Sequence, residues 1–236
     1  MSTDAARPYD TLTPDSVIDA VESGGFLSDA RILALNSYEN RVYQVGLEEG
    51  TPLIAKFYRP QRWSDAQILE EHAFTARLKE LEVSVVAPMV NPKDASTLFS
   101  FGDFRFALYP RQGGHAPELD NMDHLLSLGR VLGRMHAFGR TALFEHRPTL
   151  DIQSYAIDSS RFLLEQNFLP QSLREAYSTL ARDLIDRVTA AFARVEFNTI
   201  RLHGDCHPGN ILWRDEAPHF VDYDDARNGP AIQDLW

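Results

Sequence analysis

The sequence has 236 residues, 44% hydrophobic and 24% charged, a composition typical of a globular protein that buries a substantial core. Its formal net charge of −11, from 23 basic and 34 acidic residues, argues against non-specific binding to nucleic acids or anionic membranes. The sequence contains neither an apolar run of membrane-spanning length nor a secretory signal, and Cys206 is its only cysteine. We therefore expect a cytoplasmic monomer with no membrane or nucleic-acid partner.

The chain is expected to begin with an irregular leader followed by a helix. Residues 1–12 show no regular pattern, and we expect them to be loosely attached. The run Thr13-Pro14-Asp15 then supplies an N-cap, a first-turn proline and a first-turn acid, and Gly24-Gly25 supplies a stop. This helix is expected to cover the first lobe.

The next pattern is that of an antiparallel sheet. Strands are predicted at 32–35, 41–45 and 52–58, and residues 48–51 have the composition of a hairpin turn. The third strand places Lys56 between apolar neighbours. A lysine in such a strand either pairs its ammonium or extends it to the rim.

A helix over residues 64–81 follows, opened by a capping box at 64–67. Glu71 lies on the apolar stripe of this helix, so its carboxylate is expected to need a cation, for which Lys56 is the obvious candidate. Glu70 is the alternative partner. For either glutamate, an exposed charge on the helix face is also compatible with the periodicity.

The sheet is expected to continue before the chain enters a second lobe. Further strands are predicted at 83–88, 97–101 and 104–109. The run 110–114 then breaks the pattern with proline and glycine. We therefore predict a first lobe at residues 1–109, a linker at 110–114 and a second lobe at 115–236.

The second lobe has a helical period. A first helix is indicated by the stripe of Leu125, Leu128, Leu132 and Met135, a second by residues 153–166, and a third and longest by the stretch after Pro170. The sequence stops at Trp236 within an apolar element. We read this as a truncated sequence with an incomplete second lobe.

The richest stretch for chemistry lies near the end of the chain. Two short strands, 210–213 and 220–223, are joined by a polar turn and preceded by a polar loop. In this loop Asp205 can orient or deprotonate a hydroxyl, while Asn210 and Asp222 offer oxygens that suit Mg²⁺. Phosphoryl transfer needs little more than such positioning and charge neutralisation.

Other readings of this loop are possible. His203, Asp205 and His207 could be ligands of a metal hydrolase, but no second histidine cluster has ligand spacing, and Asn210 and Asp222 would remain unexplained. A purely structural turn would not need so many polar groups. Cys206 is expected to pack within the loop rather than react, because a neighbouring carboxylate disfavours the thiolate.

The two motifs resemble those of a known superfamily. His203-Gly204-Asp205 with Asn210 five residues on, followed by the run 221–225, is similar to the signature of the aminoglycoside phosphotransferase and choline kinase branch of the protein-kinase-like superfamily. The sequences of segments 35–44, 56–63 and 203–236 resemble those of bacterial serine/threonine protein kinases of the stress response in that branch. The resemblance implies an α+β, bilobal kinase-like fold, with an N-terminal antiparallel sheet carrying one main helix and a mainly helical C-terminal lobe.

The resemblance also implies ATP and Mg²⁺ as cofactors. It makes Asp205 and Asp222 catalytic, and it makes Asn210 and Asp222 the metal ligands, with Asp224 and Asp225 as secondary candidates. Lys56, steadied by Glu71, would hold nucleotide phosphates.

Further positions in the nucleotide site follow from the same resemblance. Ser37 lies in a loop that would cover the nucleotide but lacks glycine, and Tyr109 to Gln112 would line the adenine pocket. Asp234 would brace the catalytic loop.

Two departures from ordinary protein kinases affect the expected function. Gly204 replaces the arginine usual before the catalytic aspartate, and Tyr223-Asp224 replaces the usual Phe-Gly. Both fit the small-molecule kinase branch as well as the stress response kinases. The expected acceptor is thus a protein serine or threonine, with a small hydroxyl compound as the first alternative and a non-catalytic nucleotide-binding regulator as the second.

Overall fold

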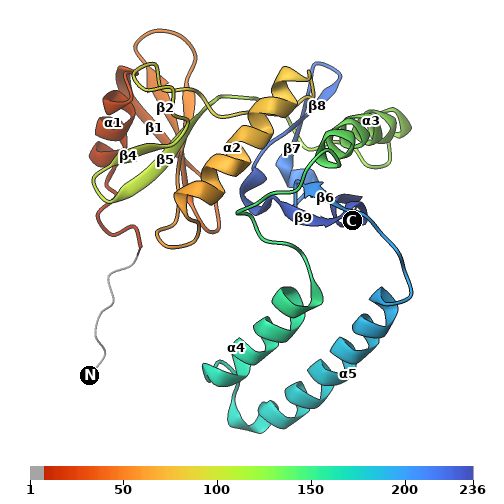
Figure 1. Ribbon diagram of the computed structural model, residues 1–236. Coiled ribbons are helices and arrows are strands. Elements are labelled where there is room, and N and C mark those ends of the chain that lie inside the picture. Colours follow the sequence, from red (N-terminus) through yellow and green to blue (C-terminus); the bar gives the residue numbers. More distant parts are fainter. Residues whose placement is uncertain (1–7, 236) are drawn as a thin grey trace, which may run out of the picture. The chain divides into compact units, whose positions relative to one another are not determined.

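The computed structural model describes residues 8–235 (Figure 1). The chain divides into two compact units. The first unit contains the residues up to Arg134 together with His207–Asp224. The second contains Met135–Cys206 and the residues from Asp225 onward. This division does not test the lobe boundary predicted at residues 110–114, which stays a prediction.

A five-stranded antiparallel sheet forms the centre of the first unit. Its strands follow the order β1-β2-β3-β5-β4. They are β1 (Ser28–Leu35), β2 (Arg41–Leu47), β3 (Leu53–Phe57), β4 (Phe99–Phe101) and β5 (Phe104–Pro110). The predicted strands at 32–35, 41–45, 52–58, 97–101 and 104–109 are confirmed within a few residues of their ends.

Helix α1 (Pro14–Ser23) covers one face of this sheet. Its start is fixed as predicted, because the Thr13 hydroxyl accepts a hydrogen bond from the Ser16 amide at 3.2 Å. The strands contribute alternate residues to the core beneath the helix, as the two-residue period of a strand requires. The buried apolar residues of this core include Val17, Ala20, Val21, Leu53, Ala55, Phe57, Phe104, Phe106 and Leu108.

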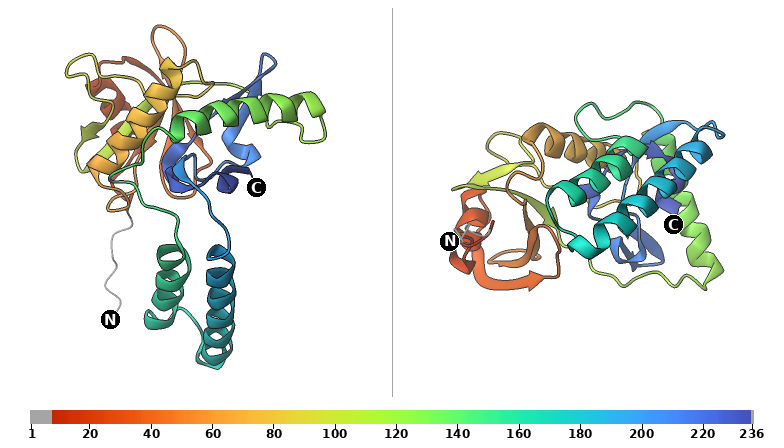
Figure 2. Two further views of the ribbon diagram at one scale, coloured as in Figure 1. Left: turned by 45° about the vertical axis from the view of Figure 1, so that its right-hand side comes forward. Right: turned by 90° about the horizontal axis from the view of Figure 1, so that it is seen from below.

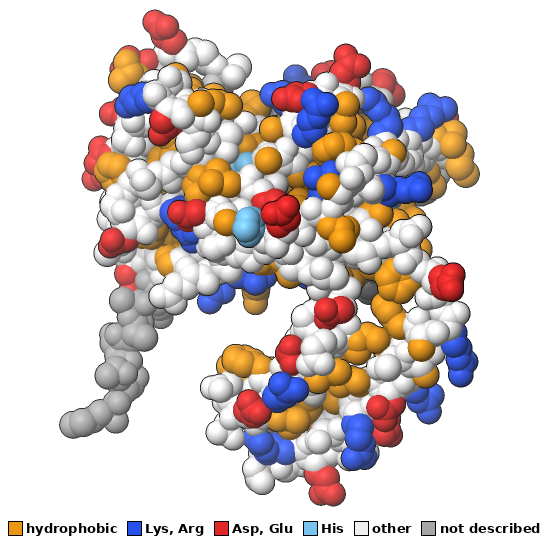
Figure 3. Space-filling view, viewed as in Figure 1, with side chains coloured by type: hydrophobic (Ala, Val, Ile, Leu, Met, Phe, Trp, Pro, Cys, Tyr) orange, Lys and Arg blue, Asp and Glu red, His pale blue; other side chains and the backbone are white. Residues whose placement is uncertain are grey.

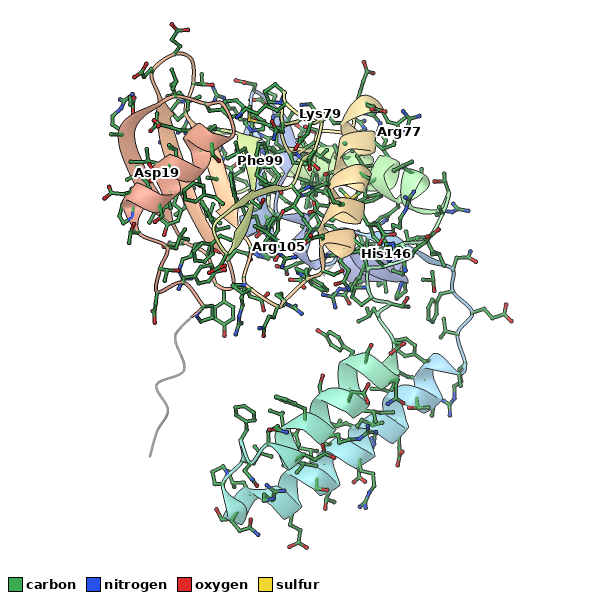
Figure 4. The ribbon with its side chains drawn as sticks, turned by 60° about the vertical axis from the view of Figure 1, so that its left-hand side comes forward. Asp19, Arg77, Lys79, Phe99, Arg105 and His146 are labelled. Atoms are coloured by element: carbon green, nitrogen blue, oxygen red, sulfur yellow. The ribbon has the colours of Figure 1, made fainter. Side chains whose placement is uncertain are left out.

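The opposite face of the sheet meets helix α2 (Asp65–Glu80). The predicted capping box is present: the Ser64 hydroxyl accepts from the Gln67 amide, and the Gln67 side chain accepts from the Ser64 amide. Arg77 and Lys79 extend from the last turns of the helix (Figure 4). Because Ala55 and Phe57 face α1, Lys56 between them points to the α2 face.

Two sequence-based expectations for the first unit were wrong. Residues 1–12 were expected to be loosely attached, and residues 1–7 of this stretch lie outside the described part of the chain. Residues 9 and 12 are instead part of the packed unit: Tyr9 packs on Phe104 with ring centroids 6.2 Å apart, and Leu12 is buried. The stretch 83–88 is not a strand of the sheet. Val85 instead makes a single parallel bridge to Phe220, and Pro88 has no amide hydrogen to donate to a ladder.

A separate hairpin in the first unit precedes the run 221–225 of the sequence signature. It consists of β7 (Ile211–Arg214) and β8 (Ala217–Phe220), paired antiparallel. The second strand ends earlier than the predicted 220–223, because Asp222 has a positive φ of 60° and residues 223–225 form a turn of 3₁₀ helix. The loop expected before β7 contains another 3₁₀ turn at Pro208–Asn210.

The second unit combines a small sheet with helices. Strands β6 (Thr199–Leu202) and β9 (Arg227–Pro230) pair antiparallel. Helix α3 (Met122–Gly139) contributes its last turns, and a 3₁₀ helix spans Ala231–Leu235. The helix predicted at 153–166 is a π-helical turn, Gln153–Asp158, followed by α4 (Ser159–Glu165).

The longest helix is α5 (Arg174–Phe192), which runs alongside α4 (Figure 2). Neither helix has a buried residue, and Leu180, Leu184 and Val188 of α5 stay 60%, 52% and 42% exposed. Figure 3 shows apolar side chains gathered along this helix pair. Within residues 8–235, no helix has both the length and the apolar character needed to cross a membrane.

Candidate active site

The β7–β8 hairpin brings the two predicted metal ligands together. Its last cross-strand pair joins Ile211 to Phe220, and beyond it the Val221 amide donates to the Asn210 carbonyl at 3.0 Å. Asn210 and Asp222 therefore flank the same end of the hairpin. The left-handed backbone at Asp222 turns its side chain out of the strand, where it remains 51% exposed.

Lys56 of β3 pairs with two carboxylates of the segment that follows the hairpin. Its ammonium lies 2.7 Å from Asp222 Oδ1 and 3.1 Å from Asp224 Oδ1. Burial by itself would lower the pKa of Lys56, but the carboxylates of Asp222 and Asp224 raise it well above the ordinary value. Lys56 therefore keeps its positive charge at neutral pH, although its side chain is only 9% exposed.

A cavity of about 360 Å³ lies beside this ion pair. Seven residues of the first unit that were predicted to bind nucleotide or metal contribute to its wall: Ser37, Lys56, Glu71, Tyr109, Gln112, Asn210 and Asp222. Among the described residues, the secondary metal candidate Asp224 does not line it. Apolar side chains complete it, including Leu35, Val42, Ile54, Val86, Leu212 and Val221. A wall that is apolar on one part and charged on another suits a planar base and a polyphosphate.

Burial favours Glu71 over Glu70 as the glutamate of α2 that acts on Lys56. Glu71 is 3% exposed and lines the cavity, whereas Glu70 is only half-buried. The charge of Glu71 also contributes to the raised pKa of Lys56. The direct ion pairs of Lys56 described above are with Asp222 and Asp224, two partners that the predicted lysine–glutamate pairing did not include.

Tyr109 is held in place by a buried hydrogen-bond network behind the cavity. Its hydroxyl lies 3.2 Å from the hydroxyl of Tyr58, which lies 2.7 Å from His72 Nε2. The other ring nitrogen of His72 lies 2.8 Å from the Thr97 hydroxyl. Burial raises the pKa of both tyrosines, so both hydroxyls stay neutral and can donate.

Asp205 belongs to the loop that follows β6 in the second unit. Its amide donates to Nδ1 of the buried His203 at 3.4 Å. Asp234 braces this loop as expected, accepting from the Gly204 amide at 2.9 Å and from the His203 amide at 3.1 Å. His136 donates its Nε2 hydrogen to the same carboxylate at 3.0 Å. Burial works to raise the pKa of Asp234, but these hydrogen bonds hold it below its usual range.

Gly204 occupies a position that only glycine fits. Its φ is +88°, and a Cβ atom there would lie 2.0 Å from the Asp225 carbonyl oxygen. The residue before Asp205 therefore cannot carry a side chain without a shift of the backbone. This is the physical reason for the expected departure from the arginine of ordinary protein kinases.

The reading of Cys206 as a reactive thiol loses support. The Cys206 thiol is half-buried, and burial together with Asp234 and Asp205 raises its pKa to about 12, so a reactive thiolate is disfavoured. His207 Nδ1 accepts from the Gly209 amide at 3.0 Å and so caps the turn. Among residues 8–235, no group of three or more His, Cys, Asp or Glu side chains is placed to hold a metal ion.

Asn40 is a residue that the sequence did not indicate. Its amide nitrogen donates to Asp224 Oδ2 at 2.9 Å, across 184 positions of the chain. Asp224 itself was expected only as a secondary metal candidate. No local pattern signals such a pair, because each residue is an ordinary polar residue next to a strand or turn.

The family model for the phosphotransferase enzyme family matches residues 31–236. The chain belongs to this family. It is 48% identical over 232 residues to stress response kinase A of Shigella flexneri, a match that covers 98% of this chain and 70% of that protein. It is 43% identical over 233 residues to the serine/threonine protein kinase RdoA of Salmonella typhimurium (strain LT2), covering 99% of this chain and 70% of that protein.

A solved structure of similar fold is that of the amicoumacin kinase hAmiN, in complex with AMP-PNP, Ca²⁺ and Ami. The TM-score is 0.73 at 19% identity, and the match covers 91% of this chain and 66% of that chain, so this chain spans just under two thirds of its length. At this identity the likeness concerns the fold alone. The expected α+β, kinase-like fold class is confirmed, and so is the expected family.

Proposed function

We propose that this phosphotransferase family member is an ATP- and Mg²⁺-dependent kinase that phosphorylates serine or threonine in proteins, as part of a stress response. The observation that carries the proposal is one cavity lined by the seven main nucleotide and metal candidates of the first unit. The name of the Salmonella typhimurium relative, a serine/threonine protein kinase, supports a protein acceptor, and the name of the Shigella flexneri relative supports a role in a stress response. ATP is available in the cytoplasm, where we place the reaction.

The residues of the cavity fit a magnesium nucleotide. Asn210 and Asp222 offer one amide and one carboxylate oxygen, which is enough for Mg²⁺, because this ion usually keeps waters and phosphate oxygens as its other ligands. When bound, Mg²⁺ neutralises the charge of the phosphate oxygens. Lys56 presents a permanent positive charge to the same cavity, and Tyr109 and Gln112 lie where we place the base.

The proposed transfer step assigns the proton to Asp205. This carboxylate orients the acceptor hydroxyl and takes its proton, while the hydroxyl oxygen forms a bond to the γ-phosphorus. The bond from that phosphorus to the bridging oxygen breaks, and ADP leaves with the electron pair. Asp234 keeps the loop of Asp205 in shape through the amides of His203 and Gly204.

A small hydroxyl compound is the second candidate acceptor. The observation that favours it is the fold shared with the amicoumacin kinase hAmiN. The glycine that stands before Asp205 is compatible with both acceptor classes.

The test is a transfer assay with ATP labelled at the γ-phosphate. Acceptors are the chain itself, dephosphorylated casein and a panel of aminoglycosides, choline and other alcohols. The Asp205→Asn variant is the control, with turnover expected to fall about 10²- to 10⁴-fold while Mg-nucleotide binding persists. Label on serine or threonine supports the protein kinase, and label only on a small molecule moves the function to the second candidate. Binding of Mg-AMP-PNP without any transfer would overturn both in favour of a non-catalytic nucleotide-binding regulator.

A further inference from the structure

Asn40 ends the loop of residues 36–40 between β1 and β2, and its side chain is fixed at both polar atoms. The amide nitrogen donates to Asp224 Oδ2 at 2.9 Å, and the amide oxygen accepts from the Arg59 amide at 3.1 Å. Asn40 is 5% exposed. An asparagine whose oxygen faces a donor and whose nitrogen faces a carboxylate has only one favourable orientation. Asn40 is therefore a rigid donor aimed at Asp224.

Asp224 divides its carboxylate between this amide and the ammonium of Lys56. Oδ2 accepts from Asn40, and Oδ1 lies 3.1 Å from Lys56 Nζ. The Asp224 side chain is 12% exposed, against 51% for Asp222. Among the described residues, the cavity wall includes Asp222 but not Asp224. Asp222 is therefore the carboxylate that faces the cavity, whereas Asp224 contacts Lys56 outside the cavity wall.

The end of the same loop is also anchored at its neighbour Glu39. The hydroxyl of Tyr9 donates to the Glu39 carbonyl at 3.0 Å and lies 3.3 Å from the Phe57 carbonyl. Ser37, which lines the cavity, lies only three residues before Asn40. Asn40 thus joins the loop of residues 36–40 to Asp224 and to Arg59, which follows the strand of Lys56.

From these contacts we propose that Asn40 and Asp224 are a pair of positioning residues: Asn40 fixes the carboxylate of Asp224, and Asp224 holds the ammonium of Lys56 in place for nucleotide phosphates. The inference rests on the proposed function, which gives Lys56 its phosphate role. Without Asp224, the ammonium would pair with Asp222 alone and would compete with Mg²⁺ for that carboxylate. The predicted consequence is weaker binding of the magnesium nucleotide.

The test compares Asn40→Asp, Asp224→Asn and the double variant that exchanges both residues. Asn40→Asp places two carboxylates at hydrogen-bond distance, and Asp224→Asn removes the charge beside Lys56. The exchange restores an amide-to-carboxylate hydrogen bond but leaves an amide, not a carboxylate, beside Lys56. The matched control is Asn121→Asp, because Asn121 accepts from the Asp123 amide at 3.0 Å at the start of α3, and aspartate caps a helix equally well.

The readouts are the dissociation constant of Mg-AMP-PNP by calorimetry, the melting temperature, and KM against kcat in the transfer assay. Each single variant is expected to weaken binding about tenfold, equivalent to about 1.4 kcal/mol, with the change appearing in KM for Mg-ATP. The exchange is expected to restore the melting temperature but not the binding. Asn121→Asp is expected to change neither.

Two results would overturn the pair. One is an exchange variant that binds Mg-AMP-PNP as the unmodified chain does, because the pair would then be a structural link only. The other is unchanged binding of Mg-AMP-PNP in Asp224→Asn. This variant keeps the test valid even if Asn40→Asp does not fold. Failure of the proposed function is a different outcome: the unmodified chain would then bind no Mg-AMP-PNP, or Lys56→Met would bind it as well as the unmodified chain does.

Discussion

The ammonium of Lys56 lies 2.7 Å from Asp222 Oδ1, although 166 positions separate the two residues in the sequence. One residue comes from the middle of a sheet strand and the other from the segment after a hairpin. Their contact places a permanent cation beside a half-exposed carboxylate at the edge of one cavity. Such a balanced pair can exchange partners when a polyphosphate and a divalent cation arrive together.

Replacing Asp222 with alanine should abolish the metal dependence of nucleotide binding. The variant loses the carboxylate that we assign to Mg²⁺, while Lys56 retains Asp224 as a partner. We expect the affinity for AMP-PNP to be the same in Mg²⁺ and in EDTA, whereas the unmodified chain should bind at least tenfold more tightly in Mg²⁺. Calorimetric titration in both buffers measures this. Asp123→Ala, at an exposed position of α3, is the control, and a variant that still gains affinity from Mg²⁺ would refute the metal role.

The stability contributed by Asp234 should depend on pH in a defined direction. Its pKa is lowered in the folded state, so its contribution is fully present above the ordinary aspartate pKa of about 3.9 and is lost as the pH falls through the lowered value. Asp234→Asn should cost roughly 1–3 kcal/mol at pH 7, and the cost should shrink below about pH 4. Urea unfolding from pH 7 to pH 3 measures the difference. Asp183→Asn, an exposed charge, should show no such trend, and a cost for Asp234→Asn that is independent of pH would contradict the prediction.

The Cys206 thiol should resist alkylation in the native chain. Because its pKa is raised from 9.0 to about 12, the thiolate fraction near pH 8 falls about 1,000-fold relative to an unshifted thiol. We expect iodoacetamide to label the native chain at least 100-fold more slowly than the chain unfolded in urea, as followed by mass spectrometry. Cys206→Ser provides the blank, since the sequence has no other cysteine. Equal rates in the two states would show that the thiol is neither buried nor shifted.

The capping box of α2 should be worth a measurable part of the stability. Ser64→Ala removes the hydroxyl that accepts from the Gln67 amide, and loss of such a cap costs about 1 kcal/mol. For a chain of this size, the melting temperature should fall by about 2–4 °C. Calorimetry checks this against Ser100→Ala, an exposed serine of β4. No difference between the two variants would mean that the cap does not stabilise the helix.

The parts of the structure that the sequence predicted are those with a local cause. The N-cap at Thr13 and the box at 64–67 each lie within one helical turn of the groups they satisfy. The burial of Glu71 followed from the periodicity of a single helix, and the burial of the strand around Lys56 from its apolar neighbours. Lys56 and Glu71 could therefore be proposed from local patterns, whereas Ser37, Tyr109 and Gln112 were expected only because the sequence resembles a known family.

The parts that the sequence did not predict depend on contacts between distant segments. The bond between Asn40 and Asp224 joins two polar residues that have no pattern of their own. Tyr9 belongs to the core because Phe104, from another part of the chain, supplies the ring on which it packs. In the stretch 83–88 the apolar composition of a strand was present, but the partner was the end of β8 rather than the sheet.

The carbonyl of Asp225 lies where a side chain at position 204 would begin. Control by a phosphorylated segment, as in many protein kinases, uses a basic residue immediately before the catalytic aspartate to grip the phosphate. No single substitution at this site can supply one without first remodelling the backbone. A lineage with this loop could therefore acquire such a phosphate-binding residue only together with a new backbone path for the Asp225 carbonyl.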